Sequence, residues 1–529
     1  MVSVEDAPRQ EEISTAKSED IGTVPPQPSA TTATTTASST KEEQPYSVQG
    51  RSHSHDEIEY RYLTFNTPLP TPTGISDVNS DRVPPPEAPD LRKYVSPFQW
   101  PKKQKAIITV ISSIATLLAS FSAGGHAPAQ SQLVPYFNIS PIVFNLGITA
   151  YTLGFAVAPM ITAPFSEING RRPIIVASGL LFMIARVVAG AAGSTYSTMV
   201  GGVLSDIYAA ENRNSPMAIY ACFALFGTGL GPMVCGIIAY HTSWRWIYYT
   251  QAIMSAVVVI PLIFFFRETR GSVLLSRKAK TLNKWYDALE DAGYVGLDLP
   301  IGDDGEKRES KRIRWKVKSD EERDTLLTMI TISVYRPFHL LFTEPVVFFF
   351  SLWAAFSWAV LYMQFGAIPI VFADIYNFNL QQTGAVFTGL CVGSLISPCL
   401  SISQDKLARR FGKMSSTPEG RLYFPCIASI LMPAGMFWFG WSSFPSTHWI
   451  VPAIAVCCIT MGIYSIYLAV FNYLADTYHR YASSAIAAQS FCRNVLGGIF
   501  PLLARWYWRG VNCSAVGPRF LRAKNSSEK

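Results

Sequence analysis

Long apolar runs joined by very short polar links are the feature that most limits how this sequence can fold. A transmembrane helix needs about 20 consecutive apolar residues, and long apolar runs flank the link at residues 163–173. A link this short makes its two flanking helices an antiparallel hairpin. Arg171 and Arg172 predict a cytoplasmic hairpin tip, because positive charge is retained on that side of a membrane. The chain is therefore predicted to be an all-α, multi-pass membrane protein.

Composition and charge agree with a membrane protein. Hydrophobic residues make up 49% of the 529 residues and charged residues only 15%, whereas soluble domains carry about 25% charged residues. Residues 1–98 hold 8 Lys/Arg against 15 Asp/Glu, and the remainder holds 36 against 22, so their net charges are −7 and +14. Basic cytoplasmic loops explain this excess. A nucleic-acid partner is not expected, because no soluble module with a basic face is present.

Several function classes lack their sequence signatures. The nine cysteines and seven histidines form no metal-ligand spacing, so no metal or other cofactor is expected. No Gly-x-x-x-x-Gly-Lys-Ser/Thr loop is present, which argues against an ATP-driven pump. We find no catalytic constellation and expect no enzyme. The remaining energy source for a membrane protein of this kind is an ion gradient.

Several motifs resemble those of the major facilitator superfamily. The link at residues 163–173, Ala-Pro-Phe-Ser-Glu-Ile-Asn-Gly-Arg-Arg-Pro, is similar to the family's loop between the second and third helices. Its Ser-Glu form resembles the fungal drug:proton antiporter branch, which includes polyamine and toxin exporters. Residues 227–236, Gly-Thr-Gly-Leu-Gly-Pro-Met-Val-Cys-Gly, resemble the antiporter motif of the fifth helix. Weaker similarities continue to about residue 505.

The resemblance implies the major facilitator fold, in which two six-helix halves surround a cavity. Residues 1–98 are too poor in apolar residues to fold alone. We therefore expect five parts: a disordered cytoplasmic tail (1–98), an N-terminal transmembrane half (99–267), a central cytoplasmic loop (268–343), a C-terminal transmembrane half (344–505) and an atypical basic tail (506–529).

Two places depart from the family pattern. The apolar stretch 174–204 is too long for one span, yet two spans with a turn need over about 40 residues. Either two shortened helices cross here, or roughly 20 residues are missing relative to the family. We expect a shortened third helix. After residue 505 no apolar run of membrane length follows, so the twelfth helix is expected to be missing.

The resemblance also implies a cytoplasmic latch. Glu167 is expected to accept hydrogen bonds from a helix N-terminus. Arg171 or Arg172, beside Gly170, is expected to pair with Asp206 and so close the cytoplasmic face in the outward-open state. The alternative is that these arginines only set the topology.

Other roles follow from the resemblance. Arg186 matches the fourth-helix arginine of proton coupling, although an arginine snorkelling at a helix end is the alternative. Arg493 is a second charge deep in the membrane, where charges are costly and functional. No Asp or Glu lies in the middle of a predicted span, so the sequence identifies no proton carrier. The antiporter motif is expected to give close helix packing through Gly227, Gly231, Pro232 and Gly236.

Two further kinds of site are expected. Aromatic and polar residues of the first, seventh and tenth helices would line a substrate cavity, although each alone is more often packing: His126, Trp358, Tyr362, Tyr464 and Asn472. Asn138, in the sequon Asn-Ile-Ser, would be glycosylated on the outer face.

These features predict a proton-coupled exporter of a small organic compound, such as a toxin, secondary metabolite or drug. Its partners would be the substrate, protons and the lipid bilayer. We expect a monomer in the plasma membrane. A polyamine:proton antiporter is one alternative, and a truncated variant that does not transport is another.

Overall fold

The computed structural model describes residues 58–72, 84–175, 186–209, 212–294, 296–301, 307–322, 325–410, 422–478 and 481–511. Seven helical stretches in these ranges are long and apolar enough to cross a membrane. They are Lys102–Phe137, Pro141–Thr162, Asn214–His241, Trp244–Phe265, Pro345–Asp374, Leu380–Gln404 and Ile450–Thr477.

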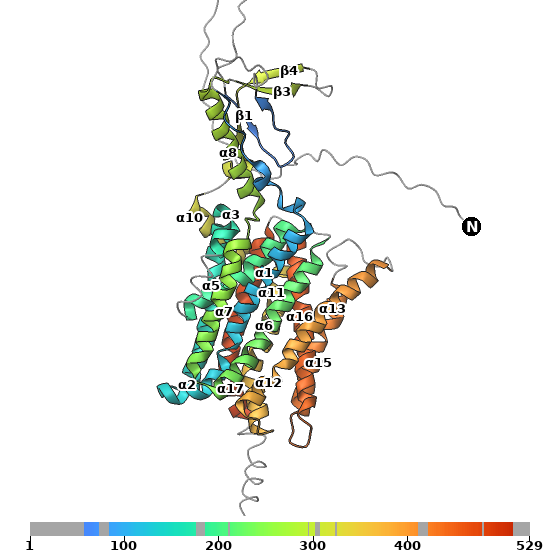
Figure 1. Ribbon diagram of the computed structural model, residues 1–529. Coiled ribbons are helices and arrows are strands. Elements are labelled where there is room, and N and C mark those ends of the chain that lie inside the picture. Colours follow the sequence, from blue (N-terminus) through green and yellow to red (C-terminus); the bar gives the residue numbers. More distant parts are fainter. Residues whose placement is uncertain are drawn as a thin grey trace, which may run out of the picture. The chain divides into compact units, whose positions relative to one another are not determined.

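The helices before residue 266 pack on one another along their lengths (Figure 1). Helix α1 runs beside α6, and α3 runs beside α5. Ser140 and Pro141 start α3, because the Ser140 hydroxyl accepts the Val143 backbone N–H at 3.2 Å and Pro141 occupies the first turn. The elements are α1 (Lys102–Gly124), α2 (Gln130–Phe137), α3 (Pro141–Asn169), α5 (Arg186–Ile207), α6 (Asn214–His241) and α7 (Trp244–Phe265).

The helices after residue 344 form a second packed group, in which α11 runs beside α17 and α16 contacts α13 and α15. Asn379 and Gln382 form a capping box that starts α12. The elements are α11 (Pro345–Asp374), α12 (Leu380–Val386), α13 (Thr388–Arg410), α14 (Tyr423–Ser429), α15 (Leu431–Ser442), α16 (Ile450–Thr477) and α17 (Ala482–Val511).

Helices α3 and α6 of the first group contact helices of the second group. Helix α3 packs on α17, where the Thr149 hydroxyl donates to the Gly498 carbonyl at 2.8 Å. Helix α6 packs on α12 and α13. A Cβ added to Gly229 of α6 would lie 2.8 Å from the Leu390 Cβ of α13. Small residues therefore allow close helix approach at both contacts.

A small α/β part lies outside the membrane-length helices and differs from the sequence prediction. Strand β1 (Glu59–Tyr62) pairs in parallel with β5 (Ile313–Lys316), and β2 (Thr71–Pro72) joins an antiparallel sheet with β3 (Leu297–Ile301) and β4 (Lys307–Lys311). The prediction of disorder through residue 98 is thus wrong for β1 and β2. These strands gain a core only from partners more than 220 residues away, which local composition does not reveal.

Helix α8 (Gly271–Asp291) covers β5 and completes the core of this part. Leu63 is 2% exposed and Trp315 is 4% exposed, and both pack against the apolar face of α8. The Asn283 side chain bonds the backbone N–H and carbonyl of Trp315 at 2.8 and 2.9 Å. The stretch 268–343, predicted to be a loop, is therefore largely structured and also includes α9 (Lys318–Glu321) and α10 (Leu326–Thr343).

Basic residues in and next to β5 form ion pairs with acidic residues of α8. Arg312 pairs with Glu290 at 2.8 Å, and Arg314 pairs with Asp287 at 2.7 Å. The hydrogen bond from Arg312 lowers the pKa of Glu290 below its usual value, and Arg314 adds to this effect. These pairs fix β5 on α8.

The two predicted departures from the family pattern fall outside the described residues. The third helix would include residues 176–185, and the residues that follow α17, 512–529, are not described either. Both therefore stay predictions.

Candidate functional site

Glu268 fixes the hairpin tip between α3 and the helical turn that begins at Arg171. Its carboxylate accepts the backbone N–H groups of Arg171 at 2.9 Å and Arg172 at 3.3 Å. Such a carboxylate is favourable at a helix N-terminus, which carries partial positive charge. Gly170 has φ 92° and ψ 160°, which only glycine adopts readily, and a Cβ there would collide with Glu268.

The sequence predicts a different residue, Glu167, as the acceptor of hydrogen bonds from a helix N-terminus. The side chain of Glu167 lies outside the described part of the chain. Glu268 was missed, although it lies shortly after the end of α7 at Phe265. The sequence feature that could have identified it is an acidic residue at the end of a helix. Sequence alone does not show that this helix end lies against the hairpin tip.

Arg171, rather than Arg172, pairs with Asp206. The Arg171 Nε donates to Asp206 Oδ2, and the Arg270 guanidinium approaches the other oxygen at 3.5 Å. The Arg171 side chain is 9% exposed, because Gly202 of α5 leaves room for its guanidinium. Arg172 instead donates to the carbonyl of Ile263 at 2.9 Å. The Arg171–Asp206 pair therefore joins the residues that follow α3 to the C-terminal end of α5.

The antiporter motif gives α6 two closely packed faces. A Cβ on Gly227 or Gly231 would run into backbone carbonyls of α1. A Cβ on Gly236 would lie 3.2 Å from the Cα of Gly384 in α12. Pro232 lies inside α6, where it meets the end of α1 and lines the cavity described next. The motif therefore joins α6 to the first group on one face and to the second group on the other.

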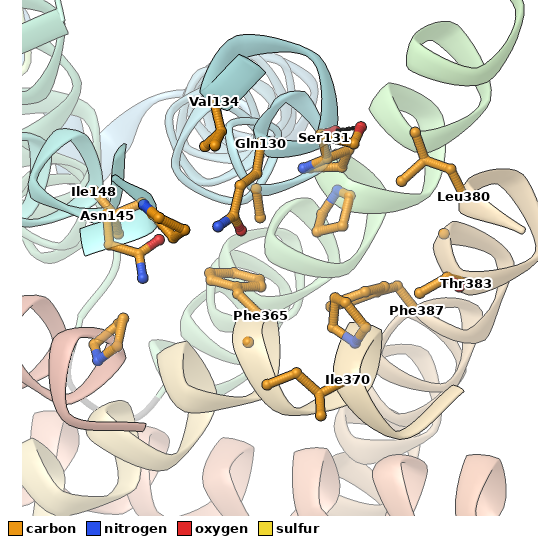
Figure 2. A pocket seen from close by; sticks show the side chains of 18 of the residues that line it. Gln130, Ser131, Val134, Asn145, Ile148, Phe365, Ile370, Leu380, Thr383 and Phe387 are labelled. Carbon is orange, nitrogen blue, oxygen red and sulfur yellow. Dashed lines mark hydrogen bonds between the residues drawn. The ribbon is translucent and has the colours of Figure 1, made fainter. Parts of the chain in front are cut away.

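A cavity of about 350 Å³ lies between the two helix groups, at the ends remote from Arg171. Figure 2 shows Gln130, Ser131 and Val134 on one side of it and Phe365, Ile370 and Phe387 on the other. Its lining is mostly apolar and includes no charged side chain. Such walls suit an apolar or aromatic organic molecule.

Away from the cavity, the first half of α6 is joined to α16 of the second group. The Tyr464 hydroxyl of α16 donates to the Ala218 carbonyl of α6 at 2.9 Å. The hydroxyls of Tyr220 and Tyr467 lie 3.1 Å apart, and both side chains are buried. At the start of α6, the Asn472 amide donates to the Asn214 side chain at 3.1 Å. The first and second groups are thus in direct contact beside the Arg171–Asp206 pair. We call these three contacts the inner seal.

None of the five residues predicted to line a substrate cavity lines this one. Tyr464 and Asn472 belong to the inner seal. His126 stacks on Phe144 with ring centroids 4.2 Å apart and bonds the Tyr248 hydroxyl at 3.0 Å. The other two, Trp358 and Tyr362, lie beside a buried arginine of α17. Of the helices expected to line a cavity, α16 contributes no residue to this one, whereas α3, α6, α12 and α17 line it although they were not predicted to.

Two remaining predicted residues have limited structural descriptions. Arg186 begins α5, but its side chain lies outside the described part. Asn138 is exposed and ends α2 with φ 50°. Their roles in proton coupling and glycosylation stay predictions. Among the described residues, no three His, Cys, Asp or Glu side chains gather as a metal site.

Comparisons with known proteins identify the family. A family profile described as Major Facilitator Superfamily matches residues 112–501. The multidrug transporter mdrA of Aspergillus fumigatus is 30% identical over 448 residues, which cover 80% of this chain and 70% of mdrA. The multidrug transporter TPO1_2 of Candida glabrata is 30% identical, with coverage of 80% and 72%. A probable drug/proton antiporter of Saccharomyces cerevisiae, YHK8, is 29% identical, with coverage of 78% and 79%.

Solved structures agree on the fold. The xylose transporter XylE from E. coli, in a partially occluded inward open conformation, gives a TM-score of 0.51 at 13% identity. The match covers 76% of this chain and 92% of that chain. Together with the membrane-length helices, these matches show that the chain is a multi-pass membrane transporter and belongs to the major facilitator superfamily.

Proposed function

We propose that this protein exports small organic compounds in exchange for protons, with drugs, toxins or secondary metabolites as its substrates. The cavity is the observation that carries this proposal. It holds about 350 Å³ between the helix groups, is mainly apolar, and lies opposite the inner seal. This arrangement is what an exporter needs in the state that releases substrate outside. The names of the fungal relatives, a multidrug transporter and a probable drug/proton antiporter, support drugs as substrates and exchange for protons.

The two helix groups are, in this proposal, the halves that rock against one another around the substrate. The contacts of α3 with α17 and of α6 with α12 and α13 would serve as the pivots. The Arg171–Asp206 pair and the inner seal would hold the cytoplasmic side shut until the halves rock. The exchange for protons and the location in the plasma membrane are inferred from the family resemblance.

Polyamine export is the second candidate, and the cavity disfavours it. A polycation needs carboxylates or other acceptors for its ammonium groups. The lining contains only a few neutral polar side chains: Gln130, Ser131, Asn145 and Thr383. We therefore rank a hydrophobic drug or toxin above a polyamine.

The direct test is efflux from yeast cells that lack their own drug exporters and express this chain. The substrate panel holds an azole, a neutral aromatic toxin, an aromatic carboxylate and spermine, each measured with and without a protonophore. We expect protonophore-sensitive efflux of an aromatic compound but not of spermine. Efflux of spermine alone would favour the polyamine reading. No efflux from cells with the chain at their surface would favour the non-transporting variant, and transcripts across residues 185–186 and past 504 would then be read.

A further inference from the structure

A buried arginine near the centre of the second helix group has no acidic partner among the described residues. Arg493 of α17 is 3% exposed. Its guanidinium carbon lies 4.4 Å from the Trp358 ring and 5.0 Å from the Tyr467 ring. Trp358 belongs to α11 and Tyr467 to α16, so aromatic side chains from two helices flank one positive charge.

These rings do not satisfy the hydrogen-bond donors of the guanidinium group. An arginine carries five N–H donors, and an aromatic face attracts its charge without acting as a conventional acceptor. Within the described residues, Arg493 Nε has no hydrogen-bond partner. One terminal nitrogen reaches the Ser490 hydroxyl at 3.5 Å, the outer limit of a hydrogen bond. A charged group with donors left over is costly to bury.

The described residues supply no carboxylate at this depth. Helix α17 contains no Asp or Glu. The acidic residues of α11 and α16, Asp374 and Asp476, lie at or next to the helix C-termini. The sequence places none in the middle of the other spans. A negative charge that pairs with Arg493 must therefore come from a bound molecule.

The arginine lies on the helix faces that lead to the cavity. Arg493, Gly497 and Pro501 are spaced four residues apart and share one face of α17, and Pro501 lines the cavity. On α11, the ring of Tyr362 lies 5.3 Å from that of Phe365, which also lines the cavity. A Cβ on Gly497 would lie 3.3 Å from Trp358 and 3.4 Å from Tyr362, so these two rings pack closely against this face of α17.

We propose that Arg493 binds the carboxylate of an aromatic organic acid and that the exporter's substrates belong to this class. The carboxylate would take the free N–H donors as a charge-assisted pair, while Trp358 and Tyr467 would contact the aromatic ring. The cavity would admit the molecule, and Phe365 and Tyr362 would move aside to let it reach the arginine. This proposal rests on the proposed export function and narrows its substrate class. A polycation would be repelled.

The test compares three probes of one shape on the purified full chain in lipid nanodiscs: naphthoate, naphthamide and naphthylmethylamine. Binding is measured by titration of tryptophan fluorescence. We expect naphthoate to bind about tenfold more tightly than naphthamide, and naphthylmethylamine to bind most weakly. Arg493→Met should abolish the preference for naphthoate, and Arg493→Lys should keep part of it.

A matched control separates this role from packing. Arg336 of α10 also lies over an aromatic ring, that of Tyr481, at 5.1 Å, but α10 contributes no residue to the cavity, whereas α17 does. Arg336→Met should leave the ratio of naphthoate to naphthamide affinity unchanged. If Arg493 only packs the helices, its substitution would weaken both probes equally and the ratio would stay constant, which would overturn the proposal.

Failure of this inference is distinct from failure of the export function. If cells that express the chain pump out neutral aromatic compounds while naphthoate shows no preference over naphthamide, the anion site is wrong and the exporter stands. If naphthoate binds through Arg493 but no compound is pumped, the site stands and the export function falls. Equal affinity for acetate and naphthoate would contradict the role of the aromatic rings.

Discussion

At the scale of single residues, the hairpin tip depends on two adjacent arginines with different partners. Arg171 is paired with Asp206 in a mostly buried site, whereas Arg172 donates only to a carbonyl. Removing one partner of a buried pair costs about 3–5 kcal/mol because the other charge stays unpaired. We expect Arg171→Ala to lower export at least about tenfold and Arg172→Ala to lower it far less. Equal losses in an efflux assay would contradict the role given to the pair.

Gly170 is the other residue on which the tip depends. Its φ and ψ cost a residue with a side chain on the order of 1–3 kcal/mol, and a Cβ would also displace the Glu268 carboxylate. Gly170→Ala should lower the melting temperature in detergent and reduce export. The matched control is Gly271→Ala at the start of α8, where the nearest atom, in Phe65, is 3.5 Å away. An unchanged Gly170→Ala protein would show that Glu268 does not hold the tip.

At the scale of elements, close packing of α6 on α1 depends on glycines, which have no side chain at the contact. A methyl group at Gly231 would overlap the Phe121 carbonyl, and forcing one into a packed core costs about 1–3 kcal/mol. Gly231→Ala should lower the melting temperature by several degrees. Gly440→Ala in α15 should not, because nothing lies within 4 Å of its added Cβ. Equal melting temperatures for these variants would contradict the packing account.

The contact of α8 with β5 should depend on pH. Arg312 and Arg314 lower the pKa of Glu290 below its usual 4.5. The stabilisation is therefore present above about pH 4.5 and is lost as the pH falls through the lowered value. Protease cleavage between residues 297 and 311 should become faster in that acidic range. Glu290→Gln should be cleaved faster already at neutral pH, with a smaller pH dependence. A wild-type rate that is constant with pH would contradict this prediction.

At the scale of the whole molecule, the sequence predicted the family and the helical bundle because both depend on local signals. Apolar runs of membrane length and the Gly-Arg-Arg link lie within short stretches of chain. The fifth-helix glycines do allow the close helix approach expected of them. Three features depend on contacts between residues far apart in the sequence, and the sequence could not predict them. They are the pairing of β1 with β5, the acceptor Glu268 and the cavity lining.

The cavity residues illustrate the limit most clearly. Tyr464 and Asn472 lie on an expected cavity helix, but on the part that forms the inner seal. Gln130 and Asn145 line the cavity, although neither is aromatic or charged. Which part of a helix meets the cavity depends on how the two groups tilt. That arrangement is set by contacts between residues far apart in the chain, so no short pattern in the sequence encodes it.

The central claim is that export requires the inner seal to open and close. Asn214 and Asn472, whose amide groups lie 3.1 Å apart, can each be replaced by cysteine in a chain whose nine native cysteines are removed. A short bis-methanethiosulfonate reagent would then tie α6 to α16, and each single-cysteine variant serves as a control. We predict that the tied protein stops exporting and that a reducing agent restores export. Unchanged export by protein verified as crosslinked would contradict the account.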